Sequence, residues 1–304
     1  MKFDEPEYPA LQLSFDRCST AAQNRTMRLT RGSLLAGVVA AAAGVVAGSD
    51  GADWGAIIAL LAFLAGAACQ FLLVKDRPER DWYDARAGAE SVKTLTWQYA
   101  VGGTPFTTSG DDEEAQRRLT KRFRDLLDSH AGLKDAPRPD ARQLTGWMKT
   151  LRSESLDVRR SVYDSDRLLD QVQWYSEKAK DNETLARRWA VATLGLQASG
   201  VLAATLRATD VIQIDLMGLA AAAAASGIAW LASKDHSGLA EAYATTAHEL
   251  VLVRDNLPVR NDETAWATFV ADAEAAISRE HTRWLARRRA IGSLGAAGPS
   301  PGSS

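Results

Sequence analysis

The feature that most constrains the fold is an apolar run near the N-terminus, residues 32–74, which contains no Lys, Arg, Glu or His. Its only charged side chains, Asp50 and Asp53, lie together near its midpoint. A helix needs about 20 residues to cross the hydrocarbon core of a bilayer. Inside lipid a helix also satisfies its own backbone hydrogen bonds. The run therefore predicts two spans, about 32–48 and 54–74, which fold back as a hairpin.

A second pair of apolar runs lies in the C-terminal half. Residues 189–206 carry no charged side chain, and residues 212–232 carry only Asp215. Lys and Arg flank the outer ends of both hairpins, and Arg207 is the exception in the second turn. Positively charged flanks are typical of cytosolic ends. We therefore expect a multi-pass membrane protein with four spans and with both termini in the cytosol.

The two hairpins align with each other at a constant shift of 158 residues and without a gap. Residues 21–26 align with residues 179–184, and Gly37 aligns with Gly195. This alignment predicts a duplication whose unit is a cytosolic helix, two spans and further cytosolic helices. Because two spans separate the copies, both copies would have the same orientation in the membrane.

Outside the hairpins, apolar residues recur at helical spacing, for example Leu119, Phe123 and Leu126. We expect an all-α membrane protein in which two transmembrane helical hairpins join a cytosolic bundle of coiled-coil-like helices. The expected organisation is a flexible N-terminal tail over 1–20, the first hairpin with its cytosolic helices over 21–155, the second over 160–288, and a disordered tail over 289–304. The last segment is rich in Gly, Ser and Pro, which do not bury a core.

Composition excludes several classes of function. The chain has 304 residues and a formal net charge of -2, so it lacks the overall basic character of a nucleic-acid-binding protein. Of its two cysteines, Cys69 lies inside the first apolar run and Cys18 lies outside it. This arrangement does not favour a disulfide and suits a reducing compartment. Residues 1–16 lack the apolar core of a signal peptide, so the first span is expected to act as its own insertion signal.

Small residues recur along the spans at intervals that suit close helix packing. The candidate packing residues are Gly44, Gly48, Gly195, Ser199, Ala203, Gly218 and Ala222. Two interpretations remain open. These residues close each hairpin, or some of them pack neighbouring subunits of an oligomer.

Few polar side chains lie within the spans. Gln70 and Gln197 either form hydrogen bonds across helices or line a water path. Asp215 lies a few residues into the fourth span, where an interfacial position is the less costly one. Because no span has a central ionisable residue, the pattern argues against an ion-coupled transporter or a proton relay.

The sequence also lacks the motifs of an enzyme. It contains no glycine-rich phosphate-binding loop and no nucleophile elbow, and its four histidines are not at metal-ligand spacing. We expect neither an enzymatic activity nor a metal or cofactor.

Several helical positions carry a resemblance to a known family. They are Arg86, Glu90, Lys93 and Trp97 after the first hairpin, Trp174, Tyr175, Ala179 and Asn182 before the second, and Glu280 and Trp284 near the end. At these positions the chain resembles the SLATT family, bacterial two-transmembrane effector domains associated with nucleotide-second-messenger and SLOG sensor systems. The resemblance covers two tandem copies, about 15–155 and 160–290. It implies insertion into or perforation of the membrane during anti-phage or other conflict responses, and it implies no catalytic residues.

The leading functional hypothesis, which the resemblance implies, is a membrane effector that oligomerises and perturbs or perforates the bacterial inner (plasma) membrane. The expected partners are the lipid bilayer, further copies of the chain, and a second-messenger synthase or sensor protein encoded nearby. In an alternative hypothesis the hairpins only anchor a cytosolic helical scaffold that recruits a sensor or an enzyme. A third hypothesis, a small channel, is weaker because the spans lack central ionisable residues.

Overall fold

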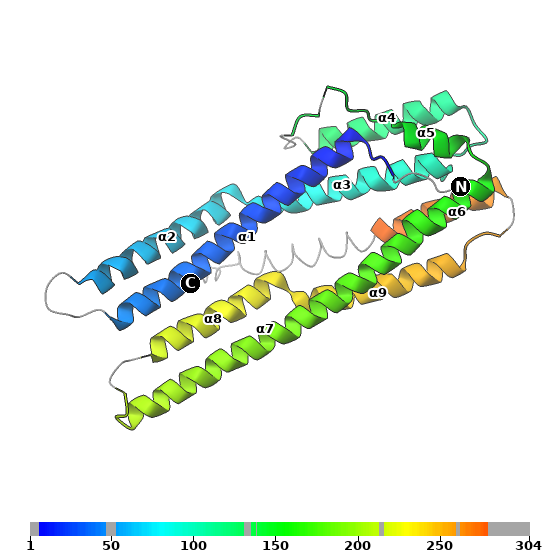
Figure 1. Ribbon diagram of the computed structural model, residues 1–304. Coiled ribbons are helices and arrows are strands. Elements are labelled where there is room, and N and C mark those ends of the chain that lie inside the picture. Colours follow the sequence, from blue (N-terminus) through cyan, green and yellow to red (C-terminus); the bar gives the residue numbers. More distant parts are fainter. Residues whose placement is uncertain are drawn as a thin grey trace, which may run out of the picture. The chain divides into compact units, whose positions relative to one another are not determined.

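The computed structural model describes residues 6–46, 53–130, 135–137, 139–212, 216–259 and 262–278. Within these ranges the regular structure is entirely helical (Figure 1), which confirms the all-α prediction. The elements are α1 (Ala10–Val45), α2 (Trp54–Asp76), α3 (Pro78–Val101), α4 (Asp112–Ser129), α5 (Gly146–Ser153), α6 (Leu156–Tyr163), a π-helix η1 (Asp164–Leu169), α7 (Asp170–Ala208), α8 (Met217–Lys234) and α9 (His236–Asp255). A further helix covers residues 263–278.

Two helical runs in the described residues are long and apolar enough to cross a membrane. They are α2 and the run Leu156–Ala208, which ends with α7. These runs contain the predicted spans 54–74 and 189–206. The predicted spans 32–48 and 212–232 do not meet the same criteria. The described part of α1 ends at Val45, and α8 has only 18 residues and ends on Lys234.

The predicted duplication is visible in the way the second helix of each hairpin ends. The cap residue Arg77 after α2 has a left-handed backbone with φ of 44°, and Asp235 after α8 has a φ of 49°. In each case the cap N–H donates to a leucine carbonyl, that of Leu73 or of Leu231. Both pairs differ by the shift of 158 residues found in the sequence. The hairpins therefore end in the same local structure at equivalent positions.

The helices form two compact units, and each unit draws on both repeats. The core unit comprises Met1–Thr20, Asp81–Ser176 and Ala242–Ser304, and the hairpin unit comprises Ala21–Arg80 and Glu177–Glu241. The helices α1, α3, α7 and α9 contribute residues to both units.

The core unit is built around large aromatic side chains. Trp97, Tyr163 and Trp266 are fully buried. The ring of Tyr163 packs edge-on against Trp97 and Trp266, with centroids 5.8 and 5.7 Å apart. Edge-to-face pairs at such distances add about 0.5–1.5 kcal/mol each beyond the area that they bury. The apolar stripes predicted outside the hairpins are therefore the faces that fill this core.

The start of the chain differs from the sequence-based expectation. Residues 1–20 were expected to form a flexible tail, but α1 already begins at Ala10, and Leu11 and Phe15 are buried in the core unit. The aromatic ring of Phe15 lies so close to Gly88 of α3 that a Cβ there would be 2.8 Å from it. The N-terminal turns of α1 are therefore a packed part of the core.

Two buried arginines hold the segment after α3. Arg152 donates to the carbonyl oxygens of Tyr99, Phe106 and Thr107 at 2.7–3.0 Å. Arg159 donates to the carbonyl of Val101 at 2.8 Å and forms an ion pair with Glu263. A buried carbonyl without a partner would cost free energy, so these guanidinium groups stabilise a non-helical segment inside the core.

Candidate functional site

Glycines bring the helices of each hairpin together. In the first hairpin, a Cβ on Gly32 would lie 3.1 Å from Cys69 Sγ, and a Cβ on Gly66 would lie 3.3 Å from Ala36 Cβ. These distances are shorter than ordinary side-chain contacts, so the absence of a side chain permits the close approach of α1 and α2. Close backbone approach at small residues is the usual way in which helices pack in lipid.

The second hairpin closes in the same way with other residues. A Cβ on Gly200 would lie 3.3 Å from Ala220 Cβ, and a Cβ on Gly227 would lie 3.4 Å from Thr193 Oγ1. The shift of 158 residues places Gly227 at the position of Cys69. At this contact the glycine is Gly32 on α1 in the first copy and Gly227 on α8 in the second. In both copies the two helices of the hairpin approach each other closely there.

The two hairpins also contact each other within the hairpin unit. The hydroxyl of Ser226 in α8 donates to the carbonyl of Leu34 in α1 at 3.4 Å. The guanidinium of Arg31 lies over the ring of Trp230, 5.0 Å from its centroid. Figure 1 shows α1 and α8 running beside each other. In the hairpin unit, α1 of the first hairpin therefore packs against α8 of the second.

Polar pairs mark the ends of the hairpins at the cap residues. Arg25 and Asp76 form an ion pair in the first copy. In the second copy the side-chain oxygen of Asn182, one of the residues of the family resemblance, lies 2.8 Å from His236 Nδ1. Partial burial, and then the charge of Lys234, lower the pKa of His236, so the ring is neutral at pH 7. The first contact joins α1 to α2, and the second joins α7 to α9, next to the caps of α2 and α8.

The predicted packing residues mostly face away from the chain. Among the described residues, a Cβ on Gly44, Gly195 or Gly218 would meet no atom within 4 Å. Ser199 is exposed, and its hydroxyl donates to the carbonyl of Gly195 at 2.9 Å. Ala203 is buried and Ala222 is half-buried, whereas Gly48 lies outside the described residues. Gln70 and Gln197 are both exposed on the surface of the single chain, and Asp215 lies outside the described residues.

Large apolar side chains cover the outside of α2. The buried residues of this helix are the small ones, Gly55 and Ala62. The exposed ones are Trp54, Ile57, Ile58, Leu60, Leu61, Phe63, Leu64, Phe71 and Val74. A water-soluble surface rarely carries so large an apolar area. With a length of 23 residues, α2 matches the thickness of a bilayer core.

The core unit contains a cluster of hydrogen-bonded polar groups, which we call the polar centre: Thr94, Tyr163, Arg167 and Glu274. Thr94 is half-buried, and the other three side chains are fully buried. Arg167 donates from Nε and Nη2 to the two carboxylate oxygens of Glu274 at 2.8 and 2.7 Å. The hydroxyl of Tyr163 donates to the same carboxylate at 3.0 Å, and that of Thr94 at 2.8 Å. The two charged side chains are 1% and 0% exposed.

The charges in the polar centre stabilise one protonation state. Burial, and then the charge of Glu274, raise the pKa of the Tyr163 hydroxyl well above its ordinary value of 10.0. For Arg167, burial acts to lower the pKa, but the charge of Glu274 and its hydrogen bonds outweigh burial and raise it. At neutral pH the centre therefore contains a neutral tyrosine and a charged arginine paired with a carboxylate. One nitrogen of the guanidinium, Arg167 Nη1, has no hydrogen-bond partner in the described part of the chain.

Arg167 lies in an unusual stretch of helix. It belongs to the π-helix η1, which joins α6 to α7 in one continuous run. Short π-helical segments inside α-helices are rare and occur frequently at functional sites. The helix that follows η1 contains the predicted third span. The polar centre thus fixes the part of the helical run that leads into the membrane candidate α7.

Sequence reasoning did not find the polar centre. A signal for it exists in the last helix, where Glu274 follows Val270 by four residues and precedes Ile277 by three. Both neighbours are buried, so Glu274 occupies the buried face of this helix. An acidic residue on an apolar helix face indicates a buried partner of opposite charge, but the sequence does not identify that partner.

The residues that carried the family resemblance pack mostly within the core unit. Trp97 is fully buried and donates from Nε1 to the hydroxyl of Tyr8 at 3.2 Å. The rings of Trp174 and Tyr175 lie 5.5 and 5.7 Å from the ring of Tyr243. Arg86, Glu90, Lys93 and Ala179 are half-buried, and Glu280 and Trp284 lie outside the described residues. Where they are described, these positions build the packing between helices.

Comparison with known proteins gives the same division into two copies. The family model of the SMODS and SLOG-associating 2TM effector domain 3 matches residues 9–160, and that of domain 1 matches residues 163–284. No curated protein and no solved structure matches the chain. Across the described residues, no group of three or more His, Cys, Asp or Glu side chains is placed to hold a metal ion. The chain therefore belongs to the SLATT family of SMODS and SLOG-associating 2TM effector domains and carries two such domains in tandem.

Proposed function

We propose that this protein is a four-span effector of the bacterial inner membrane that oligomerises through its hairpin unit and perforates the bilayer. The observation that carries the proposal is the outer surface of α2, where large apolar side chains are exposed while Gly55 and Ala62 are buried. Such a surface is stable when lipid or another apolar helix covers it. Family membership adds that both copies are two-transmembrane effector domains.

Glycines whose Cβ position faces free space support the proposed oligomerisation. Gly44, Gly195 and Gly218 lie on α1, α7 and α8, with free space where a side chain would extend. A neighbouring copy could bring a helix backbone against these positions, as the glycines inside each hairpin already do. Gln70 on α2 and Gln197 on α7 are also exposed and would then face lipid, another subunit or a water path.

The core unit supplies the cytosolic part of the proposed effector. The Lys and Arg residues that flank the hairpins favour a cytosolic position for both termini and for the core unit. A trigger from a second-messenger synthase or sensor protein encoded nearby would act there. The predicted first and fourth spans, 32–48 and 212–232, each include residues outside the described ranges.

The topology has a direct test by labelling with a membrane-impermeant maleimide. In a chain with Cys18 and Cys69 replaced by serine, Thr209→Cys lies in the second turn and Ser237→Cys lies after α8. We expect Thr209→Cys to be labelled from outside spheroplasts and Ser237→Cys to be labelled only after lysis. Labelling of both positions from the same side would overturn the four-span topology.

The perforation step has a cellular test. Induced expression of the full chain is expected to collapse the membrane potential, read with a potential-sensitive dye. Gly195→Leu fills the open face of α7 and is expected to prevent depolarisation. Val191→Leu, an exposed apolar exchange one turn earlier, is the matched control and should leave it unchanged. Equal depolarisation by the chain and by Gly195→Leu would contradict the oligomer interface.

A second candidate function is a membrane-anchored scaffold that recruits a cytosolic sensor or enzyme. The tightly packed core unit, with its fully buried aromatic side chains and polar centre, favours this alternative. Replacing both hairpins by unrelated spans separates the two functions. A scaffold should retain its effect after the replacement, and a perforating effector should lose it.

A further inference from the structure

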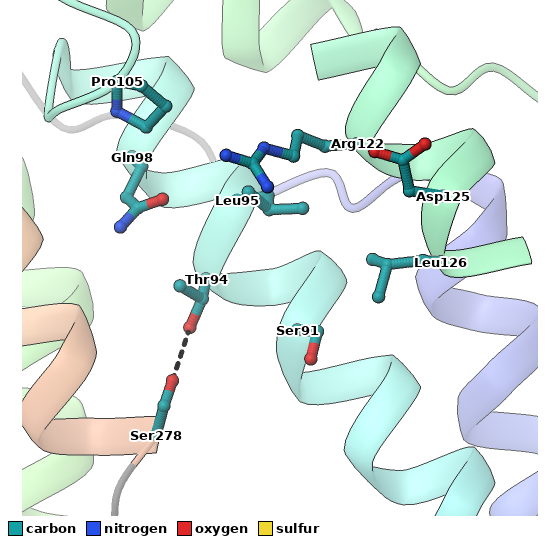
Figure 2. A pocket seen from close by; sticks show the side chains of 9 residues that line it. All are labelled: Ser91, Thr94, Leu95, Gln98, Pro105, Arg122, Asp125, Leu126 and Ser278. Carbon is teal, nitrogen blue, oxygen red and sulfur yellow. Dashed lines mark hydrogen bonds between the residues drawn. The ribbon is translucent and has the colours of Figure 1, made fainter. Parts of the chain in front are cut away.

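A pocket of about 380 Å³ lies in the core unit between α3, α4 and the last described helix (Figure 2). Small-molecule sites in proteins have similar volumes, roughly 300–1,000 Å³. Nine residues line it: Ser91, Thr94, Leu95, Gln98, Pro105, Arg122, Asp125, Leu126 and Ser278. None of them belongs to the hairpin unit.

Helix periodicity brings the lining residues together. Ser91, Leu95 and Gln98 recur at intervals of four and three residues, so they share one face of α3. Arg122 and Leu126 share one face of α4 in the same way. The lining combines an apolar part, formed by Leu95, Leu126 and Pro105, with hydroxyl, amide and charged groups. This combination is typical of a small-molecule site.

Several polar side chains that line the pocket form no side-chain hydrogen bond or ion pair with the described residues. Within the described part of the chain, Arg122, Asp125 and Gln98 have no side-chain hydrogen bond or ion pair. Figure 2 shows the guanidinium of Arg122 extending from α4 across the pocket toward α3. Thr94 is different, because its hydroxyl donates to Glu274 and weakly contacts Ser278 at 3.5 Å. One wall of the pocket is thus fixed by the polar centre, while the opposite wall offers a free cation.

We propose that this pocket binds a small molecule with an apolar body and one anionic group, a phosphate or a carboxylate. Arg122 binds the anion, because a guanidinium forms charge-assisted hydrogen bonds with both groups. Leu95 and Leu126 contact the apolar body, and the amide of Gln98 binds a polar substituent. Asp125 repels a second anionic group and so limits the ligand to one. The inference rests on the core unit alone and does not depend on membrane perforation.

The test uses the full chain in nanodiscs of phosphatidylcholine and isothermal titration calorimetry. The probes are phenyl phosphate and benzoate. Inorganic phosphate and phenol, the two parts of phenyl phosphate, are titrated for comparison. Phenyl phosphate or benzoate is expected to bind in a saturable way and more tightly than inorganic phosphate or phenol. Which of the two binds more tightly identifies the anionic group.

Two variants localise the binding. Arg122→Gln removes one charge-assisted contact and is expected to weaken binding about tenfold. Arg124→Gln, exposed on the same helix but outside the pocket, is the matched control and should change the affinity less than about twofold. The proposal would be overturned if neither phenyl phosphate nor benzoate bound in a saturable way, or if both variants lost affinity equally. Binding by inorganic phosphate as tight as by phenyl phosphate would also overturn it, because no apolar contact would then contribute.

The calorimetric result is independent of the effector function. Saturable binding without dye release from liposomes would leave the pocket assigned and refute perforation. Dye release without binding of either probe would support the effector function and refute the pocket.

Discussion

The most informative single substitution in the core unit is Glu274→Gln. The variant keeps the shape of the side chain but removes the charge that Arg167 faces in the polar centre. Breaking a buried ion pair on one side costs about 3–5 kcal/mol, because the remaining charge has no counter-ion and little water. For a folded unit of this size, 1 kcal/mol corresponds to roughly 2–4 °C in Tm. We therefore expect the Tm to fall by about 6–20 °C.

The assay is thermal unfolding followed by near-UV circular dichroism, which reports the packing of the buried Trp97 and Trp266. The matched control is Glu114→Gln, which removes one exposed partner of Arg117 and Arg118 and should leave the Tm almost unchanged. The double variant Arg167→Met with Glu274→Leu removes both charges and should regain much of the lost stability. If Glu274→Gln is no more destabilising than Glu114→Gln, the polar centre does not stabilise the core unit.

Three further predictions concern packing and pH. Gly88→Ala places a Cβ 2.8 Å from the ring of Phe15, and we expect a loss of about 1–3 kcal/mol in the free energy of unfolding, measured by denaturant titration. Gly66→Leu is expected to separate the helices of the first hairpin and to lower its resistance to proteolysis in detergent, whereas Gly195→Leu, which meets no neighbour in the chain, should not. Because the folded state raises the pKa of Tyr163 above its ordinary value of 10.0, the unfolded chain loses this proton first. The free energy of unfolding should then fall above about pH 10 by roughly 1.4 kcal/mol per pH unit for this group, and Tyr163→Phe should reduce that slope.

The parts of the fold that were predicted from the sequence depend on strong local patterns. The charge-free run 54–74 is specified by composition alone, and the structure has it as α2. The duplication was visible as a shift of 158 residues, and the caps at Arg77 and Asp235 repeat with that shift. Both features need no knowledge of which segments meet in space.

The parts that were not predicted depend on tertiary contacts. Periodicity identifies small residues but not the face on which they lie, so the sequence selected Gly195 whereas Gly200 and Gly227 pack inside the second hairpin. The N-terminal residues of α1 were predicted to be a tail. Leu11 and Phe15 are buried by distant segments of the chain, and such contacts leave no local pattern in the sequence. Arg167 and Glu274 are 107 residues apart, so no local pattern pairs them.

The central claim, that the hairpins perforate the bilayer as an oligomer, is tested most directly by dye release from liposomes. Purified chain is reconstituted at increasing protein-to-lipid ratios into vesicles of bacterial lipid loaded with carboxyfluorescein. The account predicts release that rises more steeply than in proportion to the amount of protein, and that is lost in Gly195→Leu but not in Val191→Leu. Vesicles that stay intact at every ratio, or that release dye equally with both variants, would contradict it.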